Sequence, residues 1–142
     1  MVLYAKKIEP MNAFPEQDLQ LFGTFDRGIP NKEHIAFRAS RPVDLTYYGV
    51  VLSVRLASGA GVPVRDNFFW FGPGIINGGD WIYLYTCSGR PTSTPIPNST
   101  NKVYMFFWTR ANVLFHNPDL VPLLFKFDAV TIGEPPVAAL PR

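Results

Sequence analysis

Apolar and polar residues alternate along several stretches of this chain with a period of two residues. The alternation is clear at residues 33–40, where Ile35, Phe37 and Ala39 share one side, and it is longest at residues 44–58. A period of two places successive side chains on opposite faces of an extended backbone. These two segments are therefore predicted to be β-strands.

Further strand-like runs lie between turns rich in glycine, proline and asparagine. They are predicted at residues 64–71, 81–87, 102–110, 113–115 and 123–132. Residues 72–74 (Gly-Pro-Gly) and 77–80 (Asn-Gly-Gly-Asp) read as turns, because glycine and asparagine tolerate positive φ. Residues 88–101 contain prolines at three positions and are expected to form a loop, and residues 11–20 could form one short helix or belong to an arm.

Seven or eight strands, regular turns and almost no helix predict an all-β fold, an antiparallel β-sandwich that is jelly-roll-like. We expect an N-terminal arm at residues 1–20, the sandwich at 21–133 and a proline-rich C-terminal tail at 134–142. A length of 142 residues suits one such domain. The absence of strand–helix–strand alternation argues against an α/β fold.

Some of the predicted strands are apolar on both faces, whereas a strand with one face in water is polar on that face. Since one sandwich has one interior, the second faces must be covered by loops, by a ligand or by other chains. Aromatic residues make up 15% of the chain, and tyrosine and tryptophan are enriched in protein interfaces. The interface or ligand-stacking candidates are Trp70, Trp81, Tyr83, Tyr85, Tyr104, Phe106 and Trp108.

Composition narrows the class of protein further. Apolar residues make up 47% of the chain and charged residues 17%, which excludes a disordered tail, because disorder needs low hydrophobicity and high charge. The net charge of +2 is too small, and the basic residues too dispersed, to indicate a nucleic-acid partner. No apolar run reaches the roughly 20 residues that a membrane-spanning helix needs, so no membrane partner is expected.

Side chains suited to catalysis or metal binding are few. The chain has two histidines and one cysteine, Cys87, and the paired spacings typical of zinc sites do not occur. Cys87 ends an aromatic strand and is interpreted as a buried structural thiol. Asp66 and Asp80 could act as paired carboxylates or as calcium ligands only if the fold brings them together. We therefore expect no enzyme activity, no metal and no cofactor.

Two further features bear on compartment and modification. The first ten residues lack the basic-then-apolar order of a signal peptide, so we expect cytoplasmic synthesis without a signal peptide. The triplet Asn98-Ser99-Thr100 matches the N-glycosylation acceptor pattern. Because it lies in a turn-rich loop and no secretion signal accompanies it, we interpret it as a polar turn.

These observations predict a non-enzymatic structural or assembly protein that works as a homo-oligomer or as a subunit of a larger array. A virus or bacteriophage particle, with this chain as a capsid-decorating or tail-associated subunit, is one such setting by analogy of fold. The proline-rich ends agree with arms that lie across a neighbouring subunit, because proline is already stiff.

Two other functions stay open. The first is a lectin-like, glycan-binding sandwich that stacks sugars on Trp70, Trp81, Tyr83 or Trp108, and exposed rings around a concave patch with Asp80 or Asn77 would favour it. The second is a small hydrolase that uses His116 with Asp119 or Asp128, which would need a cleft around them.

Overall fold

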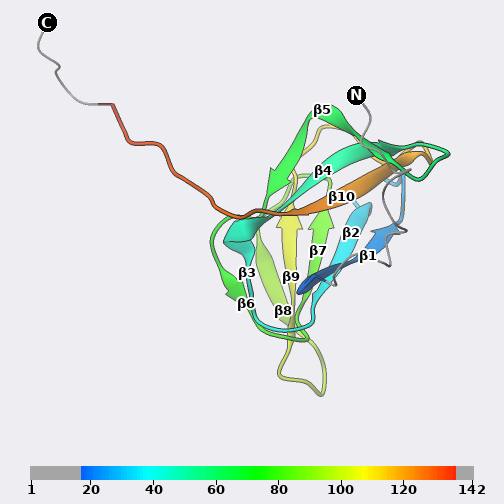
Figure 1. Ribbon diagram of the computed structural model, residues 1–142. Helices are drawn as coiled ribbons and strands as arrows, with labels where there is room; N and C mark the ends of the chain where they lie inside the picture. Colours follow the sequence, from blue (N-terminus) through cyan, green and yellow to red (C-terminus); the bar gives the residue numbers. More distant parts are fainter. Residues whose placement is uncertain (1–16, 137–142) are drawn as a thin grey trace, which may run out of the picture.

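The computed structural model describes residues 17–136, which form a β-sandwich of two main sheets with a short two-stranded sheet at one end (Figure 1). The larger sheet has the strand order β1-β2-β7-β9-β8, and the three-stranded sheet has the order β10-β4-β5. The strands are β1 Leu19–Phe25, β2 His34–Ala39, β3 Val43–Asp44, β4 Tyr48–Arg55, β5 Gly61–Trp70, β6 Ile75–Ile76, β7 Trp81–Tyr85, β8 Thr92–Pro95, β9 Lys102–Phe107 and β10 Leu120–Lys126. The predicted all-β sandwich is confirmed. Within residues 17–136, no helix is long and apolar enough to cross a membrane.

The core lies between the two main sheets and uses the alternate positions that the sequence pattern predicted. Ile35, Phe37 and Ala39 of β2 are fully buried and share one cluster with Val50 and Leu52 of β4. The other buried members are Leu19, Val43, Leu45, Tyr48, Phe71, Ile76, Ile82, Leu84, Trp108, Leu114 and Phe115. Burying one such side chain stabilises a fold by roughly 1.5–3 kcal/mol, so this cluster is the main source of stability.

β7 and β9 run parallel, and their pairing decides which aromatic row of β9 faces the core. The register joins Ile82 to Tyr104 and Leu84 to Phe106. Ile82 and Leu84 are fully buried, so the row of β9 beside them also faces inward. The segment between β7 and β9 contains β8, an edge strand that pairs antiparallel with β9. Residues 92–95 therefore form a strand where the sequence predicted a loop, and the edge position tolerates the proline.

A buried carboxylate, Glu33, holds three loops at one end of the five-stranded sheet. Its Oε2 accepts hydrogen bonds from the backbone N–H groups of Gly28 at 2.7 Å and Phe115 at 3.1 Å. Its Oε1 accepts from the N–H of Leu114 at 2.7 Å and from the hydroxyl of Thr86 at 2.8 Å. A buried charge is costly without partners, and these four donors compensate it. Residues 113–115, predicted as a strand, are instead a loop anchored by this carboxylate.

A second buried carboxylate, Asp80, precedes β7 at the opposite end of the same sheet. Its Oδ1 accepts hydrogen bonds from the side-chain amide of Asn101 and the N–H of Lys102, both at 3.0 Å, and its Oδ2 accepts from the N–H of Asn77 at 2.8 Å. Burial raises the pKa of Asp80, but these hydrogen bonds and the charge of Lys102 outweigh it. The net pKa therefore lies below the ordinary value of 3.8.

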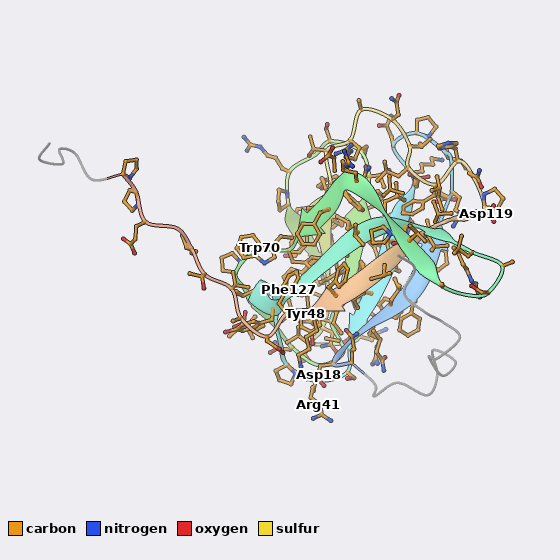
Figure 2. The ribbon with its side chains drawn as sticks, turned by 45° about the horizontal axis from the view of Figure 1, so that its top comes forward. Asp18, Arg41, Tyr48, Trp70, Asp119 and Phe127 are labelled. Atoms are coloured by element: carbon orange, nitrogen blue, oxygen red, sulfur yellow. The ribbon has the colours of Figure 1, made fainter. Side chains whose placement is uncertain are left out.

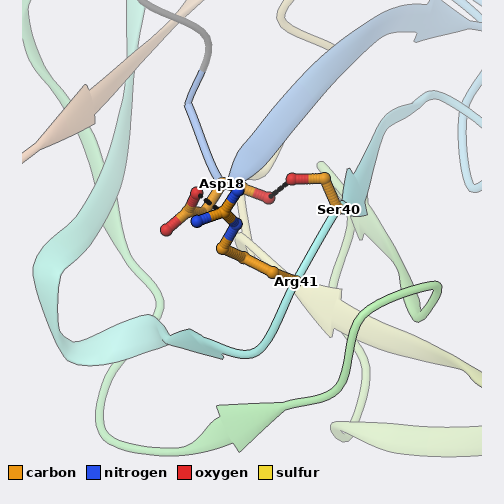
Figure 3. A network of polar contacts seen from close by, with 3 residues as sticks. All are labelled: Asp18, Ser40 and Arg41. Atoms are coloured by element: carbon orange, nitrogen blue, oxygen red, sulfur yellow. Dashed lines mark hydrogen bonds and ion pairs between the residues drawn. The ribbon is translucent and has the colours of Figure 1, made fainter.

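The first described residues already belong to the sandwich. The backbone carbonyl of Asp18 accepts hydrogen bonds from the N–H of Ser40 at 2.8 Å and from its hydroxyl at 3.2 Å. The carboxylate of Asp18 pairs with Nε of Arg41 at 3.3 Å (Figure 3). This pair is exposed and contributes at most about 1 kcal/mol. β1 thus starts inside the segment predicted as an arm, and residues 17–20 are not part of the helix suggested at residues 11–20. Residues 1–16 lie outside the described part.

The last strand ends earlier than the sequence predicted. β10 covers Leu120–Lys126, whereas the expected strand ran over residues 123–132. The N–H of Phe127 donates to the carbonyl of Tyr47 at 2.7 Å. The chain then leaves the body as an extended tail, residues 128–136, in which every residue is exposed (Figure 1). Residues 137–142 of the predicted proline-rich tail lie outside the described part.

Candidate functional site: the two outer faces of the sandwich

The seven aromatic candidates from the sequence fall into three groups. Trp81, Tyr83 and Tyr85 of β7 lie half-buried on the outer face of the five-stranded sheet, opposite the buried Ile82 and Leu84. Trp70 lies on the outer face of the three-stranded sheet, where it is 39% exposed. Tyr104, Phe106 and Trp108 face the core.

Tyr104, Phe106 and Trp108, predicted as interface or ligand-stacking candidates, therefore lie on the inner face of the sandwich. Trp108 is a member of the core cluster, and Tyr104 and Phe106 pack against it. Their rings have neighbours such as Phe69, whose centroid lies 6.4 Å from that of Phe106. Both faces of β9 are apolar in the sequence, and the parallel register with β7 decides which of them is inside.

The outer face of the five-stranded sheet contains a hollow of about 370 Å³. It is lined by Phe25, Asp26, His34, Ala36, Trp81 and Tyr83. Two small residues, Gly23 and Ala36, face each other across β1 and β2, and Ala36 lies at the base of the hollow, where it is 2% exposed. A Cβ added at Gly23 would meet no atom within 4 Å, which agrees with open space at this position.

Aromatic rings form the walls of this hollow. A β-bulge in β1 inserts Phe22, and its ring lies over Trp81 with centroids 4.9 Å apart. On the other side Phe25 stacks on His34 at 5.7 Å, and His34 lies 4.9 Å from Tyr83. The imidazole is oriented by its own hydrogen bond, in which Nδ1 donates to the carbonyl of Lys32 at 2.8 Å.

The rim of the hollow is acidic. Asp26 follows β1 in a left-handed conformation, with φ of 52°, and its side chain is exposed. Burial raises the pKa of Tyr85, and the neighbouring Tyr83, Cys87 and Asp26 raise it further.

The outer face of the three-stranded sheet is different, because its side chains are almost all apolar. Core residues occupy the alternate positions of β4 and β10, and the positions between them point outward. The outward set comprises Val51 and Ser53 of β4, Phe68 and Trp70 of β5, and Val121, Leu123, Phe125 and Phe127 at β10, and the exposed Arg55 borders it at the end of β4. The Ser53 hydroxyl is fully buried and has no hydrogen-bond partner among the described residues. We call this set the apolar face.

Two contacts fix the aromatic rings on the apolar face. Phe68 lies over Gly49, where an added Cβ would come within 2.5 Å of the ring, so only glycine leaves room for it. The ring of Phe127 lies 6.0 Å from that of Phe68 and 6.3 Å from that of Phe125. The indole N–H of Trp70 donates to the carbonyl of Thr46 at 2.8 Å. These rings are held in place although Phe68 is 48% exposed.

The extended tail leaves the body beside this apolar face. Figure 2 shows Trp70 and Phe127 on the side from which residues 128–136 depart. Val130 is 38% exposed and Ile132 is 81% exposed, so the tail carries apolar side chains that the body does not cover. Its Pro135 and Pro136 stiffen the backbone.

The side chains considered for other chemistry are not brought together. Both carboxylate oxygens of Asp80 are engaged by N–H donors, while Asp66 is exposed on β5, so they do not form a carboxylate pair. His116, Asp119 and Asp128 are exposed, and none of them lines the hollow. Within residues 17–136, no group of three or more His, Cys, Asp or Glu side chains could hold a metal ion.

Asn77 and Asp80 do not line the hollow, so the concave patch differs from the one anticipated for a lectin. The residues that sequence reasoning missed are Phe22, Phe25 and Asp26, whose position depends on the bulge in β1. Asn98 is exposed at the turn between β8 and β9, with φ of 58°, as expected for a polar turn. Comparisons with known proteins add no relative: no family model matches the chain, and no curated protein or solved structure resembles it significantly.

Proposed function

We propose that this protein is a non-enzymatic assembly subunit that associates with further copies of itself through the apolar face. The observation that carries the proposal is the apolar face, whose rings Phe68 and Trp70 are 48% and 39% exposed, with an exposed apolar tail beside it. Contiguous apolar patches larger than a few hundred Å² are rare on monomeric proteins and mark interaction surfaces.

The length of the tail favours a neighbouring copy as its binding partner. Residues 128–136 span up to about 30 Å when extended, whereas three strands spaced about 4.8 Å apart are much narrower. The tail also points away from its own sheet in Figure 1. It therefore reaches far enough to cross the apolar face of a second copy, where Val130 and Ile132 would be buried.

The cost of ordering the tail is small. Pro135 and Pro136 already restrict the backbone, so less conformational entropy is lost on docking than for a flexible segment. An assembly made by exchanged tails suits a repeating array. A virus or bacteriophage particle is one such array, and that setting rests on analogy of fold alone.

The solution mass measured by light scattering over a range of concentrations tests the proposal. We expect the full chain to form an oligomer, and we expect Leu123→Glu to convert it to a monomer because a charge in the centre of the apolar face opposes its burial. Removal of residues 128–142 should weaken association in the same way. Ile75→Glu is the matched control, because Ile75 is 71% exposed on β6, outside the apolar face, and association should persist.

Two results would overturn the proposal. The first is a full-length chain that stays monomeric at every concentration, which would leave the apolar face to residues 1–16 or to another protein. The second is an oligomer that Leu123→Glu and the truncation both leave intact. Far-UV circular dichroism of each variant shows that the sandwich has folded, so a monomer cannot be confused with an unfolded chain.

The glycan-binding alternative has less support. Sugars stack on exposed rings that lie flat and are flanked by free hydrogen-bonding groups, whereas Phe22 and Trp81 are tilted by 52° and Asp80 is occupied. Glycan binding is retained as an outcome of the experiment in the next subsection.

A further inference from the structure

We propose that the hollow on the outer face of the five-stranded sheet is an aromatic cage for an alkylated ammonium group, such as the trimethylammonium of choline. This proposal does not depend on self-assembly, because the hollow and the apolar face lie on opposite outer surfaces of the sandwich.

The shape of the hollow fits a compact group. The buried Ala36 lies at the base, and the rings of Trp81, Tyr83 and Phe25 line the hollow around it. A volume of about 370 Å³ is at the small end of the range of ligand sites, roughly 300–1,000 Å³. The hollow therefore suits a small head group better than an extended chain.

The orientation of the rings favours a cation over a flat sugar. Among the lining rings, the planes of His34 and Tyr83 differ by 42° and those of Phe25 and His34 by 25°. Phe22, beside the hollow, is tilted by 52° to Trp81. Tilted rings surround a ligand instead of offering one flat platform. The face of an aromatic ring attracts a cation within about 6 Å, and tryptophan and tyrosine do so most strongly.

The charge at the rim points the same way. Among the described residues that line the hollow, Asp26 supplies the carboxylate, and no lysine or arginine is among them. Arg38 pairs with Trp81 in the sheet register but is not part of the lining. An anion would meet the charge of Asp26, whereas a cation would be attracted by it and by the rings.

The left-handed backbone at Asp26 makes the charge separable from the fold. Asparagine tolerates positive φ as well as aspartate does, so Asp26→Asn removes the carboxylate without straining the turn. Phe107 provides a control on the same outer face. Its ring stacks on Tyr85 at 5.5 Å but does not line the hollow.

Calorimetric titration of the full chain with choline tests the proposal, and the uncharged tert-butyl isostere, in which carbon replaces nitrogen, is the control ligand. We expect choline to bind and the isostere to bind at least about tenfold more weakly. Trp81→Leu and Asp26→Asn should each weaken choline binding by about fivefold to tenfold. Phe107→Leu should leave it unchanged.

Further titrations distinguish a lipid headgroup from a free cation and test the glycan-binding alternative. Binding to phosphatidylcholine vesicles in addition to free choline would support the cage with a lipid headgroup as its source, and binding of choline alone would support a free cation. Equal binding of choline and its isostere, or binding of neutral mono- or disaccharides and not of choline, would overturn the proposal. Should Trp81→Leu fail to fold, Asp26→Asn still decides whether the charge matters.

Discussion

The outer faces of the two main sheets both carry several aromatic rings, but they differ in what surrounds those rings. On the five-stranded sheet, the rings of Trp81 and Tyr83 border a hollow with a carboxylate at its rim. On the three-stranded sheet, Phe68 and Phe125 lie among valine and leucine. Aromatic content alone therefore says little about the partner, whereas the polarity and shape around the rings separate a surface suited to a small ligand from one suited to another subunit.

Both outer faces depend on the stability of the whole sandwich, and loss of Glu33 should therefore affect them together. Glu33→Ala leaves the N–H groups of Gly28, Leu114 and Phe115 without their acceptor in the interior. We expect the free energy of unfolding to fall by about 3–5 kcal/mol. Urea denaturation measures this loss, and Glu134→Ala in the exposed tail is the control. A loss below about 1 kcal/mol would show that these loops hold without the carboxylate.

Acid should weaken the five-stranded sheet first, since Asp80 ties the starts of β7 and β9 together. Its folded pKa lies below 3.8, so its stabilising contribution is complete above the ordinary carboxylate range and is lost as pH falls through the folded pKa. We expect Asp80→Asn to cost about 1–3 kcal/mol at neutral pH and to flatten the decline of stability below pH 4. Thermal melting from pH 7 to pH 2 tests this, with Asp128→Asn as the exposed control. An unchanged acid profile would assign the decline to other carboxylates.

A change at Gly49 should disturb the apolar face and leave the hollow intact. An added methyl group would meet the Phe68 ring at 2.5 Å and the carbonyl of Phe69 at 3.1 Å, so the ring must move away. We expect Gly49→Ala to cost about 1–2 kcal/mol and to weaken self-association. Gly133→Ala, where an added Cβ meets nothing within 4 Å, should do neither. Sedimentation velocity measures self-association, and melting curves measure stability. If Gly49→Ala still associates like the unchanged protein, the contact between copies lies outside the apolar face.

The smallest effect on stability is expected from filling the hollow. Ala36→Val adds two methyl groups at a position that is only 2% exposed, and the lining rings can shift toward the hollow, so we expect a loss of about 1 kcal/mol, the low end of the cost of overpacking. Choline binding should nevertheless be lost, while the solution mass stays the same. If this variant still binds choline, the cation does not bind against Ala36 at the base of the hollow.

The strand pattern of the sequence predicted the sandwich and much of its core, because alternation reports which residues share a face. Ile35, Phe37 and Ala39 lie inside as predicted. Alternation does not report which face is inside when both are apolar, so it could not place Trp108 on the inner face. That choice depends on the parallel register of β7 and β9, which joins residues about 20 positions apart and leaves no local signal.

The alternation of apolar and polar residues could not predict the hollow, for a related reason. Its base lies at Ala36, which pairs with Gly23 in β1, and the bulge in β1 places the ring of Phe22 over the lining residue Trp81. A bulge shifts the alternation by one residue, so a strict period of two assigns these residues to the wrong faces. The apolar face was partly anticipated, because the run at residues 68–71 is aromatic on both sides.

The pairing of β10 with β4 has a consequence for the order of events during synthesis. β4 ends at Arg55 and β10 starts at Leu120, so the ribosome makes all the intervening strands before this pair can close. Until then β4 has no partner on that edge, and half of the apolar face has not been made. A nascent or shortened chain therefore cannot present the surface proposed for assembly, and only subunits that have finished folding would be able to join one another.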